Sequence, residues 1–202
     1  MGKQVQPGEE IYIAPGITGK RDENGELFIY DDLTGDQLDP KKNIEDKIRI
    51  FERQVNEWFL ERAHALRREE KNGFIILMVA TAYIEGVEQY REGESSENQS
   101  AAIFKNGIKR IFGIENKYDK RLSELYKELR CGLFHNGMTG PHIRIASDHE
   151  TPIDLSDETI ININQILFLE KVKSDFEQYL KDLQDTEKTE LRENFNSMYE
   201  FE

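Results

Sequence analysis

Hydrophobic residues recur at helical spacing along most of the chain from residue 39 onward. In residues 39–70 the apolar positions are three or four apart, which predicts a long amphipathic helix. The positions that carry this pattern are Ile44, Ile48, Phe51 and Val55. Asp39 suits the N-cap of this helix, and Pro40 suits its first turn. Residues 74–92 are apolar on nearly every side through their first half, as expected of a helix at the centre of a bundle.

Three more helices are predicted further along the chain. One covers residues 101–113, a second covers 118–132, and a third runs from about residue 164 to 183. The last stretch, 185–202, keeps helical spacing at its apolar positions and is predicted to be an acidic tail or a short docking helix.

Two segments have the alternating, β-branched character of strands instead. Residues 9–32 contain two such runs around Asn24-Gly25, a turn sequence that predicts a β-hairpin. The following DDLTGDQLDP is predicted to be a loop. Residues 142–147 and 159–164 are also strand-like, and we expect them to form a second hairpin before the last long helix.

These patterns predict a mainly α fold, a helical bundle of about five helices with two small β decorations. Residues 1–38 form the N-terminal extension with its hairpin, residues 39–184 the bundle with a hairpin insertion at 142–164, and residues 185–202 the C-terminal tail.

Composition restricts the environment of the chain. One cysteine among 202 residues allows no internal disulfide. The longest apolar run, 74–80, is far shorter than the roughly 20 residues that span a bilayer, and the opening residues show no secretory signal. We therefore expect a soluble, cytoplasmic protein without membrane contact.

Charge is unevenly distributed. The formal net charge of −13 means that the protein as a whole repels nucleic acid. Residues 105–135, however, contain eight basic and four acidic residues, whereas residues 182–202 contain two basic and seven acidic ones. The basic segment closes on the sequence ELRCGLFHNGMTG, residues 128–140.

Arg130 and His135 are the candidate chemical groups of that sequence. A guanidinium binds phosphate bidentately, and an imidazole exchanges protons near neutral pH. Together they suit cleavage of an RNA phosphodiester without a metal, with the ribose 2′-OH as nucleophile. Five residues span about 140° on an ideal α-helix, which would separate the two side chains. Gly132 can end the helix between them and let the chain fold back toward Arg130.

A structural interpretation of the same residues is available. Arginine and histidine near a helix C-terminus are favoured by the helix dipole and by free carbonyl groups.

The chain has no Gly-rich phosphate loop, no nucleophile elbow and no cysteine-rich zinc pattern, so we expect no cofactor and no metal.

A helical bundle with an arginine, four to six residues and then a histidine late in the bundle resembles the HEPN superfamily (higher eukaryotes and prokaryotes nucleotide-binding). LYKELRCGLFHNGMT is similar to the prokaryotic ribonuclease and toxin-type members. The resemblance implies a homodimer with two motifs at a shared cleft, and a metal-independent endoribonuclease that leaves 2′,3′-cyclic phosphate ends, in a toxin–antitoxin or defence system.

The resemblance also assigns roles to residues. Arg130 would bind the scissile phosphate and His135 would act as general acid and base. Many catalytic members have a polar residue after the arginine, whereas this chain has Cys131; Asn136 could supply a polar contact instead. Tyr126 and Cys131 could line the site, or pack in the core. The basic residues that could steer RNA toward the motif are Lys120, Arg121 and Lys127.

Two alternatives to an enzyme remain open. The same fold could bind a nucleotide or RNA without turnover, a reading that Cys131 and the net charge favour. The motif could also simply cap a helix in a protein-interaction domain, whose partner, such as a cognate antitoxin, would contact the acidic tail or the 142–164 hairpin.

Overall fold

The computed structural model describes residues 8–200 of the chain, so the first seven residues of the predicted extension and the last two of the predicted tail lie outside it. It divides into two compact units. The first comprises residues up to Phe59 together with the C-terminal residues from Tyr199, and the second comprises Leu60–Met198. The boundary between the units falls inside the long helical stretch predicted for residues 39–70.

The first unit contains a four-stranded antiparallel sheet in the order β1-β2-β3-β4. Its strands are β1 (Glu10–Ala14), β2 (Ile17–Arg21), β3 (Leu27–Asp31) and β4 (Gln37–Leu38). The hairpin predicted at Asn24-Gly25 is confirmed, and it joins β2 to β3. The sequence analysis predicted one hairpin here and missed a second one, formed by β1 and β2. Gly16 adopts a left-handed φ of 66° and turns the chain between these two strands. The predicted loop likewise contains β4.

The helix α1 (Ile44–Arg53) completes this unit. Its predicted start at Asp39 and Pro40 was wrong by several residues. Asn43 is the N-cap, and its side chain accepts a hydrogen bond from the backbone N–H of Glu45. The helical stretch continues as the π-helix η1 (Gln54–Leu60), with i→i+5 hydrogen bonds, before it returns to α-helix.

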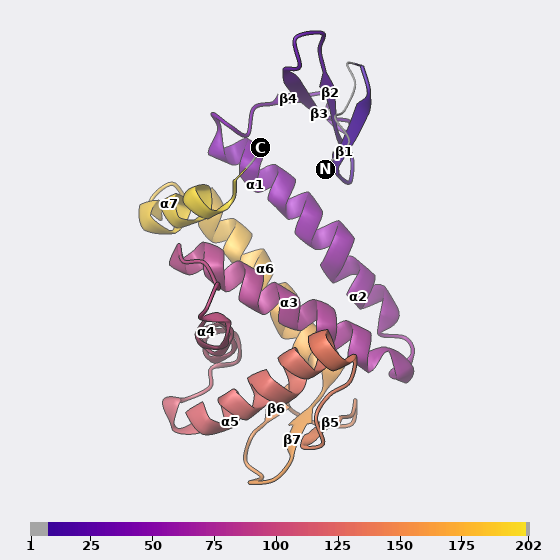
Figure 1. Ribbon diagram of the computed structural model, residues 1–202, viewed down its shortest axis with the longest axis vertical. Helices are drawn as coiled ribbons and strands as arrows, with labels where there is room; N and C mark the ends of the chain where they lie inside the picture. Colours follow the sequence, from indigo (N-terminus) through magenta and orange to yellow (C-terminus); the bar gives the residue numbers. More distant parts are fainter. Residues whose placement is uncertain (1–7, 201–202) are drawn as a thin grey trace. The chain divides into compact units, whose positions relative to one another are not determined.

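The second unit is a helical bundle organised around α3 (Gly73–Glu92), as Figure 1 shows. The other helical elements are α2 (Glu61–Leu66), η2 (Glu70–Asn72), α4 (Ser100–Phe112), η3 (Asn116–Tyr118), α5 (Asp119–Leu125), η4 (Tyr126–Asn136), α6 (Gln165–Gln184) and α7 (Thr189–Met198). Helix α3 packs against α4, α6, α7 and η4, and its buried residues include Ile76, Leu77, Ala80 and Ile84. This arrangement confirms the predicted central helix, because only a helix with neighbours on several sides buries apolar residues all around.

The predicted short helix at the C-terminus is also present as α7. Phe195 is fully buried in this helix and meets the ring of Tyr90 on α3 edge-on, with centroids 5.9 Å apart.

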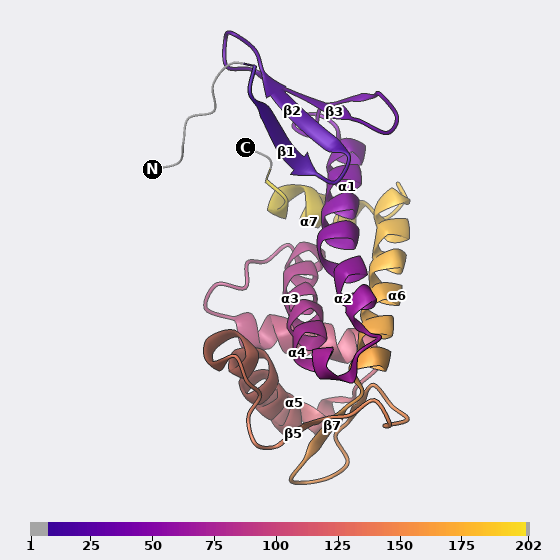
Figure 2. The same cartoon turned by 90° about the vertical axis from the view of Figure 1, so that its right-hand side faces the viewer.

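A small mixed sheet replaces the predicted hairpin at residues 142–164. Its strands are β5 (Ile143–Ile145), β6 (Ile153–Asp154) and β7 (Ile161–Ile163), and β7 is central. Strand β5 pairs with β7 in parallel, and β6 pairs with β7 antiparallel. The intervening chain is long enough for the crossover that a parallel pair needs. The sheet lies at the end of the bundle where α6 begins (Figure 2), and Asn164 follows β7 directly and caps α6.

Candidate functional site

The predicted motif lies on η4, a π-helix that continues α5 without a break. The expectation that Gly132 ends this helix was wrong: the helix runs on to Asn136, and Gly137 ends it in a left-handed conformation with φ of 67°. The backbone N–H of Gly137 donates to the carbonyl of Gly132, five residues earlier. In such a helix, side chains five positions apart follow each other on one side. The spacing of Arg130 and His135 therefore fits one helical face, which an α-helix would not allow.

Gly132 has a different role from the one predicted. A Cβ atom at this position would lie 2.6 Å from the carbonyl oxygen of Met138. The chain leaves the helix at Gly137 and returns directly across Gly132, and the N–H of Gly140 donates to the carbonyl of Glu128 at 2.9 Å. Glycine is needed because a backbone segment packs where a side chain would begin.

Arg130 is held by an acidic residue of the central helix. Its Nε donates to Oε2 of Glu85 on α3 at 2.8 Å, and the side chains are 21% and 10% exposed. Within residues 8–200, neither terminal nitrogen of this guanidinium has a hydrogen-bond partner. Glu85 fixes the position of the guanidinium and leaves its outer edge, with the two terminal nitrogens, available to a ligand.

Two aromatic rings flank this guanidinium. Its Cζ lies 5.9 Å from the centroid of Tyr126 and 4.9 Å from that of Phe134, which are four positions before and four positions after it in sequence. Tyr126 is fixed by a 2.6 Å hydrogen bond to the hydroxyl of Ser100 and by the ring of Phe104, 5.6 Å away. Phe134 is 43% exposed. Tyr126 therefore contacts the guanidinium from the packed side of η4, and Phe134 contacts it from the exposed side.

The tyrosine and the cysteine of the motif are linked electrostatically. Burial raises the pKa of the Tyr126 phenol, the hydrogen bond with Ser100 opposes this, and the Cys131 thiol adds to the rise. Tyr126 therefore stays neutral at physiological pH and can act as a hydrogen-bonding group but not as an anion. Cys131 itself is half-buried.

His135 and Asn136 lie in the last turn of η4 and are exposed. No other residue in the described part of the chain forms a hydrogen bond or an ion pair with the His135 ring. The imidazole is thus open to solvent and to a ligand, but its tautomer is not set by a neighbouring acceptor.

The basic residues predicted to attract RNA differ in their surroundings. Lys120 and Lys127 are exposed, and neither has an ion-pair partner among residues 8–200. Arg121 is only 13% exposed and is paired with Glu124. Other cations of the basic segment are neutralised in the same way, since Lys109 pairs with Asp119 and Lys117 pairs with Glu115. Arg110 and Arg130 pair with Glu88 and Glu85 on α3, outside the segment, so the local positive surplus at the surface is small.

Sequence reasoning missed Glu85 and Phe134. A signal for Glu85 was available, because a carboxylate in the middle of an apolar helix must find a cation when it is buried. Phe134 had no comparable signal, because an aromatic residue inside an amphipathic pattern normally packs in the core.

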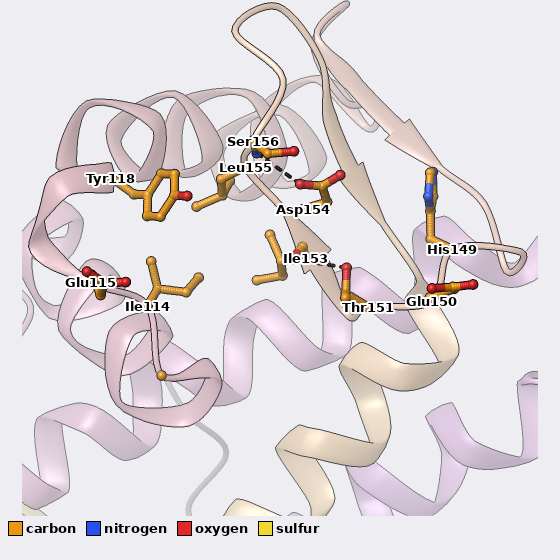
Figure 3. A pocket seen from close by; sticks show the side chains of 11 residues that line it. Ile114, Glu115, Tyr118, His149, Glu150, Thr151, Ile153, Asp154, Leu155 and Ser156 are labelled. Atoms are coloured by element: carbon orange, nitrogen blue, oxygen red, sulfur yellow. Dashed lines mark hydrogen bonds between the residues drawn. The ribbon is translucent and has the colours of Figure 1, made fainter.

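A cavity of about 520 Å³ lies elsewhere in the second unit, where the α4–α5 junction meets the segment around β6. Ile114 and Tyr118 face Ile153 and Leu155 across it (Figure 3). Its charged side chains are acidic: Glu115, Glu150 and Asp154. Hydrogen bonds from Ser156 lower the pKa of Asp154, which stays ionised. Such a lining repels phosphate groups, so the cavity does not suit a nucleic acid.

Two further properties bear on function. No group of three or more histidine, cysteine or acidic side chains is placed to hold a metal ion within residues 8–200. In the same part of the chain, no helix has both the length and the apolar character that a membrane span requires.

Comparisons with protein-family models, with curated proteins and with solved structures found no match to this chain.

Proposed function

We propose that this protein is a metal-independent endoribonuclease of the HEPN type, centred on Arg130 and His135. The observation that carries the proposal is the guanidinium of Arg130, which Glu85 orients through Nε while both terminal nitrogens stay available. A cation fixed in this way is preorganised for a phosphate, and preorganised charge is a large contribution to transition-state stabilisation. His135 follows at the spacing of one π-helical turn and is open to solvent.

The chemistry follows from these two groups. Arg130 binds the non-bridging oxygens of the scissile phosphate. A base removes the proton of the ribose 2′-OH, the 2′ oxygen forms a bond to phosphorus, and the 5′ oxygen leaves with a proton supplied by an acid. The products are a 2′,3′-cyclic phosphate and a 5′-hydroxyl. One imidazole supplies only one of the two proton transfers at a time.

The need for an acid and a base favours a homodimer, in which His135 of a second copy supplies the other proton transfer. In a toxin–antitoxin system in the cytoplasm, a cognate antitoxin would restrain this activity.

A second candidate is a module that binds RNA or a nucleotide without turnover. It is favoured by the absence, within residues 8–200, of any group that orients the His135 imidazole. It is also favoured by the ion pair with Glu85, which offsets the charge of Arg130.

An RNA-cleavage assay in EDTA separates the two candidates. Wild type, His135→Ala and the control His64→Ala, which changes a histidine on α2, are incubated with mixed structured RNAs. The enzyme requires cleavage by wild type and the control, with cyclic-phosphate ends, and no cleavage by His135→Ala. RNA binding that depends on Arg130, without any product, would select the binding module.

A further inference from the structure

The two rings beside Arg130 have different surroundings, although both lie four positions from it. Tyr126 is bound to Ser100 and packs on Phe104. Phe134 is 43% exposed, and no other aromatic ring in the described part of the chain packs on it. Several large apolar side chains of the described residues are exposed, but Phe134 is the one that lies over a guanidinium whose terminal nitrogens have no partner within residues 8–200. This combination of an open ring and an available cation points to a ligand.

The position of this ring relative to the cation limits the kind of ligand. The Cζ atom of Arg130 lies 4.9 Å from the centroid of Phe134, so a phosphate on the terminal nitrogens sits next to the ring. The group attached to that phosphate in a nucleic acid is a nucleoside, which carries a flat aromatic base. Bases stack on exposed aromatic side chains whatever their sequence, because each has a π face.

We infer that Phe134 is the stacking surface for an unpaired base of single-stranded RNA, beside the phosphate that Arg130 binds. This inference rests on the proposed function and names its substrate class. A base within a duplex has both faces covered by its neighbours, and the grooves of A-form RNA do not admit an aromatic side chain to a base face. The site therefore selects loops, bulges and single-stranded ends over helical RNA.

Binding of an RNA that cannot be cleaved tests this inference separately from catalysis. The probe is a short, fluorescent, single-stranded RNA of mixed sequence with 2′-O-methyl riboses, which lack the nucleophilic hydroxyl. Its affinity for the full chain is measured by fluorescence anisotropy in EDTA. Wild type is compared with Phe134→Ala, with Phe134→Trp, which keeps a stacking ring, and with Met138→Ala, which removes a neighbouring exposed apolar side chain.

The expected result is a loss of about tenfold in affinity for Phe134→Ala, the usual effect of removing one base–aromatic stack. Phe134→Trp and Met138→Ala should stay close to wild type. The same strand in a perfect duplex should bind wild type more weakly, and Phe134→Ala should change that binding little.

An abasic strand with the same phosphates distinguishes stacking from an indirect effect on Arg130. If Phe134 contacts a base, Phe134→Ala leaves the affinity for the abasic strand unchanged. An equal loss on both strands would overturn the inference, because the ring would then act only through the guanidinium.

Two other outcomes separate this inference from the proposed function. Arg130-dependent RNA binding that is unaffected by Phe134→Ala would overturn the stacking site and leave the proposed function intact. Failure of wild type to bind any of the RNAs would overturn both.

Discussion

Glu85 and Arg130 are 45 positions apart in the chain, and the Nε of Arg130 donates to Oε2 of Glu85 at 2.8 Å. This ion pair joins the central helix α3 to the π-helix η4. It is also the contact that determines how the guanidinium is presented, since it occupies Nε alone.

Arg130→Met is expected to lower the free energy of unfolding by about 3 kcal/mol, because it leaves the carboxylate of Glu85 buried without its cation. Urea denaturation at neutral pH measures this difference. Lys127→Met on the same helix is the control and should change stability by no more than about 0.5 kcal/mol, since Lys127 is exposed.

A double variant extends this test. Combining Arg130→Met with Glu85→Gln should recover part of the lost stability, because no buried charge then remains. Additive losses in the double variant would show that the two residues are not coupled. Because Arg130 variants are expected to lose stability, His135→Ala is the cleaner probe of catalysis.

Gly132→Ala is expected to destabilise the protein by about 1–3 kcal/mol, the usual cost of overpacking. The new Cβ would lie 2.6 Å from the carbonyl oxygen of Met138, and the backbone there cannot yield as a side chain would. Gly86→Ala on α3 is a matched control, because nothing lies within 4 Å of its Cβ position. The control should gain about 0.5–1 kcal/mol from helix propensity. Thermal unfolding of both variants should shift in opposite directions; a neutral Gly132→Ala would contradict the close approach.

A polar network around Arg110, whose side chain is 30% exposed, connects α4 to α3 and α6. Arg110 pairs with Glu88 on α3 through Nε and Nη2, at 2.9 and 2.8 Å, and with Asp175 on α6. The Tyr83 hydroxyl donates to the same aspartate at 2.9 Å. Burial raises the pKa of Glu88, and it raises the pKa of Tyr83 together with the nearby Asp175.

Arg110→Met is therefore expected to cost about 3 kcal/mol, since it leaves the buried carboxylate of Glu88 without its cation. Asp175 keeps a 3.8 Å contact with Arg91. The free energy of unfolding in urea is the measurement. The control Arg144→Met, at an exposed position of β5, should be close to neutral. A loss no larger than that of the control would mean that water solvates the network.

The loop after η4 should make stability sensitive to acid. Glu128 accepts hydrogen bonds from the backbone N–H of His142 at 2.9 Å and interacts with its Nδ1 at 2.7 Å. Partial burial acts to raise the pKa of Glu128, but the bonds from His142 outweigh it, so the pKa lies below its ordinary value of 4.5. A carboxyl group with a lowered pKa contributes stability at pH values above its unfolded pKa and loses that contribution as the pH falls through its folded pKa.

The stability difference between wild type and Glu128→Gln should accordingly be constant above about pH 4.5 and shrink below it. Urea unfolding at a series of pH values measures this dependence. Glu158→Gln, at an exposed position of the segment that joins β6 to β7, should show no such dependence. A difference for Glu128→Gln that is unchanged in acid would mean that the carboxylate makes no ionised contact with His142.

Local pattern determined much of the fold. The apolar periodicity of residues 74–92 predicted α3, the Asn24-Gly25 turn predicted the β2–β3 hairpin, and Gly113 was placed correctly at the end of α4. These features depend on residues close in sequence, whose hydrogen bonds and steric preferences act whatever lies around them. The position of Arg130 near the end of a helix was determined in the same way, whereas His135 was predicted to lie beyond that end.

Contacts between distant segments decided the rest. The pairing of Glu85 with Arg130, the parallel pairing of β5 with β7 and the return of the chain across Gly132 each join parts of the chain that no local pattern relates. The sequence pattern also did not predict that η4 is a π-helix. The i→i+4 and i→i+5 hydrogen bonds use the same backbone groups, and side-chain packing selects between them. Sequence thus supplied the two chemical groups of the candidate site, and tertiary structure decided which atoms of Arg130 a ligand can reach and left the His135 ring exposed.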